Sequence, residues 1–494
     1  MASIVPRPGD VRSFWLQEAL DADPGVPCPP LTRRVSADVC IVGGGFAGLW
    51  TAHELLDRDP SLRIALLEAD ICGGGASGRN GGFVSSSWHD LDGLCRLYGE
   101  EPGVRYARAL ADQVAEVGSW CQTHAVDAWF HHEGVAMLET NPDQCGAHGK
   151  MLEGARSRGL DVIEPLDREG AARIARSPVV EGGMLVADCA IVQPARLARG
   201  LRRVALERGV RIHEGTPMCA IEGGGRPIVR TPRGAVRAGS VVVAIGAWAT
   251  GRRGFRTRLT NIADYVVVTE PIPDHLQQIG WTSNTGIADF REMLYYLRPT
   301  EDRRIAIGGG TTGALFGGRI GHGATRLRSV AEESARGLRY LFPSLEDVRI
   351  THAWGGPIDV TPSWTPFFTT VRPGVVCGLG FSGHGLAATK LGGKTLASMV
   401  LGRDDEWTRL PVVGDAVGRF PPEPFRWPLV RSAVLGMLRH DRAADSGRRP
   451  PLPWRLLDGA PSTYRALFSA RRGSGATELR QGGGCDARPR AGNG

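Results

Sequence analysis

Six residues near the N-terminus have the types and spacing of a nucleotide-binding turn. They read Gly43-Gly44-Gly45-Phe46-Ala47-Gly48 and follow the apolar run Val39–Val42. A stretch with helical character continues from them to Leu56. In such a strand–turn–helix unit, Gly43 permits a tight turn, Gly45 lets the backbone approach a pyrophosphate, and Gly48 lets the helix pack closely on the strand. The pattern predicts a dinucleotide whose pyrophosphate lies at the helix N-terminus.

A carboxylate follows at the position where such a cofactor presents its ribose. The second apolar run, Ile64–Leu67, ends at Glu68, twenty residues after Gly48. An acid at this spacing accepts a hydrogen bond from a ribose hydroxyl and disfavours a 2'-phosphate. FAD and NAD both satisfy this motif, so later segments must decide between them.

The next segment is a glycine-rich loop that carries polar side chains. It reads GGGASGRNGGF from Gly73 to Phe83, with too many glycines for a regular helix or strand. Together with GGGFAG and the LLEA that ends at Ala69, this loop resembles the D-amino-acid oxidase and glycine oxidase superfamily, in particular its gamma-glutamylputrescine oxidase-like branch. The resemblance implies bound FAD. It also implies that the loop follows the flavin, with cofactor-binding roles for Ala76, Ser77, Arg79, Asn80 and Gly81.

Two middle segments are similar to the stretches in which this family returns to its cofactor domain. One return is resembled by Ile191–Pro194, the downstream Arg211–Ile212 and Thr216–Ile221, where the backbone near Met218 would face adenine. Val241–Trp248 resembles the other, a buried parallel strand followed by a turn. The alternative for the second segment is a core strand only. The resemblance implies cofactor contacts from Ala244, Gly246, Ala247 and Trp248.

A late segment, GLGFSGHGL from Gly378 to Leu386, precedes a helical pattern that extends to Leu401. The family uses this loop at the flavin. Backbone donors and a helix dipole there would stabilise the negative charge that a reduced flavin develops. This implies roles for Ser382, Gly383, His384, Gly385 and Leu386. We interpret His384 as a flavin-contacting or structural residue rather than a general base.

The stretches between these segments have a different character. Val104–Trp120 has apolar residues at helical spacing, and Tyr265–Thr269 and Arg304–Ile307 read as strands. The predicted fold class is α/β: an FAD-binding, Rossmann-like domain of the glutathione-reductase type with a discontinuous, antiparallel-sheet substrate domain of α+β type. We expect the FAD-binding domain at 36–103, 189–260 and 351–405, the substrate domain at 104–188 and 261–350, a C-terminal extension at 406–470 and a disordered tail at 471–494.

Four side chains of the predicted substrate domain could face the reacting molecule. By the family resemblance these are Tyr295, Tyr296, Arg298 and Trp354. Aromatic walls would desolvate an amine, and an arginine could hold a carboxylate. The alternative for each of them is core packing, because aromatic residues at alternating strand positions are usually buried.

The reaction that the resemblance implies is hydride transfer to flavin N5 from the carbon beside an amine nitrogen. The imine then hydrolyses to an aldehyde or keto product. An amino acid, an N-alkyl amino acid and a polyamine derivative remain open as substrates. Family oxidases pass the electrons to oxygen, but the sarcosine oxidase branch has a lysine where this chain has Ala306. Two alternatives therefore remain: a flavin dehydrogenase that reduces a quinone or protein acceptor, and a non-catalytic flavin-binding subunit.

Composition excludes several classes of protein. The net charge of +7 is carried by the segment after residue 420, so the rest is balanced and does not predict a nucleic-acid-binding surface. Ten cysteines without a CxxC pair or a metal-type cluster, and no apolar leader, favour reduced thiols, no metal site and a cytoplasmic location. No apolar run is long enough to span a membrane.

Trp354–Pro366, where sarcosine oxidases carry a flavin-linked cysteine, contains none, which predicts non-covalent FAD. Trp427–Leu438 could form an amphipathic helix, which we expect to pack on the protein's own surface rather than on a membrane.

Overall fold

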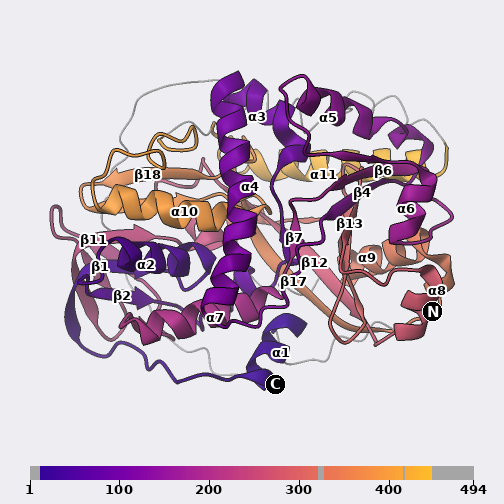
Figure 1. The fold of residues 1–494 in the computed structure, drawn as a ribbon. Coiled ribbons are helices and arrows are strands. Elements are labelled where there is room, and N and C mark those ends of the chain that lie inside the picture. The colour runs from indigo at the N-terminus through magenta and orange to yellow at the C-terminus, as the bar shows by residue number, and fades with distance from the viewer. Residues whose placement is uncertain (1–11, 321–327, 415–417, 448–494) are drawn as a thin grey trace.

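The computed structural model describes residues 12–320, 328–414 and 418–447, which fold around two large sheets (Figure 1). The first sheet is mainly parallel, and its strands run in the order β18-β19-β11-β1-β2-β8. The strands are β1 (Arg34–Val42), β2 (Ile64–Leu67), β8 (Arg211–His213), β11 (Ala235–Val243) and β19 (Val375–Leu379), with β18 (Phe367–Arg372) antiparallel at one edge. The hairpin of β9 (Ala220–Glu222) and β10 (Ile228–Arg230) continues antiparallel from β11.

The register of this sheet determines which residues emerge together. Val42 pairs with Leu67 on one side and with Val243 on the other. The chain therefore leaves β1, β2 and β11 at the same level, and the next residues are Gly43, Glu68 and Ala244. Segments that are 25 to 201 residues apart in sequence (Gly43 to Glu68, and Gly43 to Ala244) are in this way brought to one edge of the sheet, as is usual for the carboxyl ends of parallel strands.

Helices on one side of the first sheet form a shared core with it. These are α2 (Phe46–Arg58), α3 (Leu91–Tyr98), α4 (Glu100–Thr123), α7 (Pro194–Glu207) and α10 (Gly385–Val400). Figure 1 shows α4 crossing beside α2 and α10, and Val114 and Val117 of α4 belong to the same apolar cluster as Trp50 and Leu391. The helix predicted at Val104–Trp120 is thus confirmed. Because it packs on the nucleotide side, we propose that the substrate domain begins after α4 rather than at residue 104.

The second sheet is antiparallel except where β13 meets β4, and runs in the order β16-β12-β15-β14-β13-β4-β6-β5. Its strands are β4 (Val135–Glu139), β5 (Glu164–Leu166), β6 (Gly182–Val186), β12 (Thr260–Thr269), β13 (Gly286–Asp289), β14 (Tyr295–Pro299), β15 (Ile305–Gly309) and β16 (Gly313–Ala314), with β17 (Ile350–Val360) paired to β12. Because β17 belongs to this sheet, we propose that the last return to the FAD-binding domain begins after Val360 rather than at residue 351.

The two faces of the second sheet have different partners. Val267, Leu297 and Ile307 pack with the helices α6 (Arg168–Ile174), α8 (Pro273–Ile279) and α9 (Arg328–Leu341). Side chains alternate along a strand, so the neighbouring even-numbered residues of β12, β14, β15 and β17 point the other way, toward the first sheet. The predicted fold class, a nucleotide-binding α/β domain with a discontinuous antiparallel sheet, is confirmed.

The remaining elements connect or flank the two sheets. They are α1 (Phe14–Ala22), α5 (Ala147–Arg156), α11 (Arg426–Asp445), the strand pair β3 (Phe83–Val84) and β7 (Ala190–Ile191), and the 3-10 helices η1 (Ala76–Gly78), η2 (Trp88–Asp90), η3 (Pro142–Gln144), η4 (Gly246–Ala249), η5 (Phe316–Gly318) and η7 (Pro343–Leu345). The predicted C-terminal helix is α11, which packs on the protein itself: Val430 is buried, and Trp427 Nε1 donates to Ala314 O at 3.2 Å.

Two further expectations concern membranes and thiols. No helix of the described residues has the length and apolar character needed to cross a membrane. Eight cysteines are free thiols, but Cys219 is disulfide-bonded, so the expectation of a fully reduced set is wrong at that position. The predicted disorder after about residue 470 falls outside the described residues.

Candidate functional site

The glycine turn after β1 is shaped by close backbone approaches. Gly43 has a φ of +113°, and a Cβ built there would lie 2.2 Å from Ala244 O. A Cβ at Gly48 would lie 2.0 Å from Gly43 O. Gly45 precedes α2 as its N-cap and, as a glycine, offers no side-chain cap of its own. The turn therefore forms the glycine cradle, over Gly43–Gly48, that a pyrophosphate requires.

Glu68 closes this cradle from the end of β2. Its Oε2 accepts from Gly44 N at 2.7 Å, and its Oε1 accepts from Asp70 N at 2.9 Å. Burial raises the pKa of the carboxyl, against the lowering effect of the two backbone donors. Each carboxylate oxygen can accept more than one hydrogen bond, so Glu68 retains capacity for ribose hydroxyls.

The glycine-rich loop, residues 73–83, is attached to both sheets. Ser77 Oγ accepts from Phe46 N at 2.9 Å, which joins the loop to the start of α2. Arg79 donates from Nε to Gly74 O at 3.0 Å and from Nη1 to Gly355 O at 3.2 Å, which joins the loop to β17. Asn80 folds the loop on itself, because its Nδ2 donates to Ala76 O at 3.0 Å and its Oδ1 accepts from Gly82 N at 2.8 Å.

The two later cofactor segments meet at Asp359 of β17. Gly380 N donates to Asp359 Oδ2 at 2.5 Å, and Ser382 N donates to Asp359 O at 3.0 Å. A Cβ at Gly246 would lie 3.9 Å from Asp359 Oδ1, so the carboxyl lies beside both segments. Burial raises the pKa of Asp359 to about 6. The carboxyl thus holds the turn before α10 against η4.

The other residues that were predicted to contact the cofactor lie around the glycine cradle and at the start of α10. Met218 is buried, and its carbonyl accepts from Arg252 Nη2 at 2.9 Å. Trp248 is 49% exposed, and its ring covers Gly75 of the loop. Ser382 has a φ of +51°, and α10 begins after His384 without a side-chain cap. The side chains of Ala247 and Leu386 point into the core, so these residues could contribute only backbone groups.

The sheet face that meets the glycine-rich loop carries a carboxylate that the sequence reasoning missed. Asp264 of β12 accepts from Tyr296 Oη at 2.6 Å and from Tyr265 N at 2.9 Å. Burial raises the pKa of Asp264 to about 6, and no cation among the described residues forms an ion pair with it. The signal was an acid inside the mainly apolar run TNIADYVVVT (Thr260–Thr269), since a central strand rarely carries an unpaired charge.

Tyr296 lies on this face of the sheet, whereas Tyr295 does not. The ring of Tyr296 contacts Gly81 and lies 5.6 Å from the Phe83 ring, so it faces the glycine-rich loop. Tyr295 is the next residue of β14 and points to the opposite face, where its hydroxyl donates to Glu333 at 3.3 Å. Strand alternation therefore directs Tyr295 away from the glycine-rich loop.

Arg298 and Trp354 lie on the correct face but are engaged with the protein. Arg298 is buried, its Nη1 donates to Val192 O, and its guanidinium lies 5.3 Å from the Trp15 ring. Trp354 is buried against the same Trp15 ring and donates from Nε1 to Arg79 O at 2.8 Å. Both side chains thus contact other parts of the chain, and their roles in facing a substrate stay predictions.

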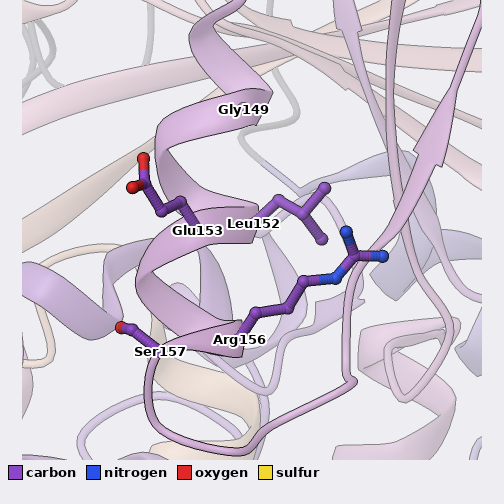
Figure 2. Close-up of a pocket in the computed structure, with 5 residues that line it drawn as sticks. All are labelled: Gly149, Leu152, Glu153, Arg156 and Ser157. Carbon is purple, nitrogen blue, oxygen red and sulfur yellow. The ribbon is translucent and has the colours of Figure 1, made fainter.

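A surface depression on α5 lies apart from this site. Gly149, Leu152, Glu153, Arg156 and Ser157 line it, all on one short segment (Figure 2). None of the predicted site residues belongs to it. The candidate active site is instead the region where the glycine cradle, the glycine-rich loop and the sheet face that carries Asp264 come together.

Comparisons with known proteins agree with this geometry. The family model described as "FAD dependent oxidoreductase" matches residues 38–399. The gamma-glutamylputrescine oxidoreductase of Escherichia coli is 28% identical over 417 residues, which cover 82% of this chain and 94% of that protein. The probable oxidoreductase OrdL of Haemophilus influenzae is 25% identical over 76% of this chain and 86% of its own length. Glycine oxidase from Geobacillus kaustophilus has a similar fold, with a TM-score of 0.63, 21% identity, and coverage of 75% of this chain and 96% of that one.

Proposed function

Because this chain belongs to the family of FAD-dependent oxidoreductases, we propose that it oxidises a primary or secondary amine. Bound FAD supplies a hydride acceptor at N5 for the carbon beside the amine nitrogen, and the imine product hydrolyses to an aldehyde or ketone. The glycine cradle, Glu68 and the glycine-rich loop are the residues that would hold the cofactor. We propose that they hold it without a covalent bond, since Trp354–Pro366 has no cysteine.

The observation that supports an amine as substrate is the carboxylate of Asp264. It lies on the sheet face that contacts the glycine-rich loop, and among the described residues it has hydrogen-bond donors but no cationic partner. A buried carboxylate without a counter-ion is costly, and a protonated amine would supply the missing positive charge. Asp264 and Tyr296 are both half-buried.

Asp264 would also hold the proton that the amine must lose before oxidation. A protonated amine has no lone pair to assist hydride departure, so the neutral form must be produced at the site. Transfer of one proton from the ammonium nitrogen to the Asp264 carboxylate gives a neutral amine and a neutral carboxylic acid. Burial favours this neutral pair, and it is the same burial that raises the pKa of Asp264 to about 6.

The same face argues against a substrate with a carboxylate on the reacting carbon. Asp264 would repel such a group, and Arg298 is occupied by Val192 O and the Trp15 ring. We therefore expect amines without an adjacent carboxylate to be preferred over glycine-like acids. The E. coli relative is named for a derivative of a diamine, which supports this choice.

Anaerobic reduction of the flavin tests the proposal directly. The holoenzyme is mixed in separate experiments with a monoamine, a diamine, a singly N-acylated diamine, sarcosine or glycine. The decrease in flavin absorbance at about 450 nm is then followed. We expect bleaching with at least one amine that lacks a carboxylate and little with glycine or sarcosine. The Asp264→Asn variant should bleach at least tenfold more slowly, whereas Glu101→Gln, whose side chain is 88% exposed on α4, should match the wild type.

Two alternatives have their own outcomes in this assay. Firmly bound FAD that no amine bleaches would indicate a non-catalytic flavin-binding subunit. If bleaching occurs, comparing hydrogen peroxide formation with dye reduction separates an oxidase from a dehydrogenase that uses a quinone or protein acceptor. Ala306 supports the dehydrogenase, because it is buried and apolar at the position where the sarcosine oxidase branch has a lysine.

A further inference from the structure

The N-terminal helix α1 lies outside the segment that matches the family, yet it contacts the glycine-rich loop directly. The family match begins at residue 38, whereas α1 spans Phe14–Ala22. Trp15 is fully buried and packs in one apolar cluster with Ala306 and Trp354 of the second sheet. The helix thus packs on the same sheet face that carries Asp264, and Val266, two residues further along β12, belongs to its apolar cluster.

Three consecutive carbonyls of the glycine-rich loop are occupied by side chains from outside it. Ser13 Oγ donates to Gly78 O, and Trp15 Nε1 donates to Asn80 O at 3.0 Å. Between them, Trp354 Nε1 donates to Arg79 O at 2.8 Å. A loop with this many glycines has high conformational freedom, so fixing three adjacent peptide groups greatly restricts its backbone.

The helix is itself anchored, so that it can hold the loop in place. Gln193 Nε2 donates to Trp15 O and to Glu18 Oε2, each at 2.7 Å. Glu18 also forms an ion pair with Arg196 of α7 at 2.6 Å. The guanidinium of Arg298 lies against the Trp15 ring from the sheet side. The position of α1 is therefore determined by α7 and by β14 together.

The backbone donors of the loop are affected by this arrangement. The amide groups of Asn80 and Gly81 make no hydrogen bond to any part of the chain that the structure describes. The carbonyls of Arg79 and Asn80, which share peptide groups with these two amides, are held by Trp354 and Trp15, so both amides have fixed orientations and remain available as donors. Oriented backbone donors of this kind suit an electron-rich ring edge or an anion.

We propose that α1 is a positioning element of the FAD site: Ser13 and Trp15 hold the glycine-rich loop in the conformation that binds the cofactor. The role belongs to residues that precede the family segment and touch the loop only through its carbonyls. This proposal concerns cofactor affinity and does not depend on which substrate is oxidised.

The test measures FAD affinity and global stability in full-length variants. Trp15→Phe keeps an aromatic ring but removes the Nε1 donor, and Ser13→Ala removes the hydroxyl. The control is Gln17→Ala, because Gln17 is exposed on the same helix and its side chain donates to Asp21 Oδ1 at 2.7 Å, away from the glycine-rich loop. The dissociation constant of FAD is obtained from the quenching of flavin fluorescence on addition to deflavinated protein. The visible circular dichroism of the bound flavin and the melting temperature of the deflavinated protein are recorded in parallel.

We expect Trp15→Phe and Ser13→Ala each to raise the FAD dissociation constant about fivefold, as the loss of one hydrogen bond does. We also expect altered flavin dichroism, with a melting temperature close to that of Gln17→Ala. The proposal is overturned if both variants bind FAD as Gln17→Ala does. It is overturned equally if weaker binding is matched by a comparable fall in the melting temperature of the deflavinated protein, which would show that α1 acts on general stability only.

Discussion

Tyr296 and Asp264 lie on strands that are not neighbours, yet the Tyr296 hydroxyl reaches the Asp264 carboxylate at 2.6 Å by crossing over Gly308. β15 separates β14 from β12, and Gly308 is the residue of β15 that lies under the phenol. A Cβ there would be 2.1 Å from the Tyr296 oxygen. The hydrogen bond therefore exists because β15 presents no side chain at this point.

The first prediction concerns Gly308. Gly308→Ala should displace the Tyr296 ring and break its hydrogen bond to Asp264, lowering kcat/KM for the amine at least tenfold. Binding of FAD should change little, because Gly308 lies in the second sheet and not in the glycine cradle. Gly149→Ala is the matched control, since a Cβ there meets nothing within 4 Å. Steady-state kinetics and FAD titration of both variants give the answer, and equal kinetics would contradict the role of the pair.

The second prediction is a shift in pH dependence. The Tyr296 hydroxyl lowers the pKa of Asp264, against burial, which raises it to about 6. Since kcat/KM reports ionisation of the free enzyme, it should rise as pH increases through about 6 and Asp264 becomes a carboxylate. Tyr296→Phe removes the donor, so the midpoint of this rise should move to higher pH. An unchanged midpoint would show that another group controls the profile.

The third prediction links Asp264 to stability. Its pKa is raised from an ordinary 3.8 to about 6, so the folded protein binds the proton more tightly than the unfolded chain. The stabilisation of the folded state by this tighter proton binding is fully present below about pH 4. It is lost as pH rises through about 6, which lowers the free energy of unfolding by up to about 3 kcal/mol. Asp264→Asn carries no charge. The melting temperature of Asp264→Asn, taken relative to that of the wild type, should therefore be higher at pH 8 than at pH 4, even though the variant is less active. A difference in melting temperature that does not vary with pH would refute this prediction.

The fourth prediction concerns Glu68. Its two carboxylate oxygens accept from Gly44 N and Asp70 N. Glu68→Gln places an amide NH2 against one of these donors, which should raise the FAD dissociation constant roughly ten- to a hundredfold, the usual effect of losing a hydrogen bond to a charged group. Glu101→Gln on the exposed side of α4 serves as the control. Fluorescence titration at constant ionic strength distinguishes the two variants.

The fifth prediction concerns the attachment of FAD. Precipitation of the holoenzyme with acid should leave a colourless pellet and a yellow supernatant, because the segment Trp354–Pro366 provides no cysteine for a covalent bond. A pellet that remains yellow after washing in denaturant would show a covalent link and would require another attachment residue.

The cofactor segments could be read from sequence because their requirements are local. A glycine turn such as Gly43–Gly48 and an acid such as Glu68 are defined by spacing within one strand–turn–helix unit and the strand that follows. The substrate side depends on long-range register. From the sequence alone, Tyr295 and Tyr296 are equally plausible as substrate-facing residues. The pairing of β14 directs Tyr296 toward the glycine-rich loop and Tyr295 toward α9.

The sequence by itself determined the nucleotide-binding unit, the family and the alternation of cofactor and substrate segments, because short motifs and apolar periodicity carry that information. Only the tertiary structure decided that Asp264 meets Tyr296 across Gly308, that Arg298 is held by Val192 and Trp15, and that α1 supports the glycine-rich loop. The physical reason is that the contacting pairs are between 32 positions apart (Asp264 and Tyr296) and 283 positions apart (Trp15 and Arg298), and no local pattern encodes which side chains of separate strands and helices will share one face.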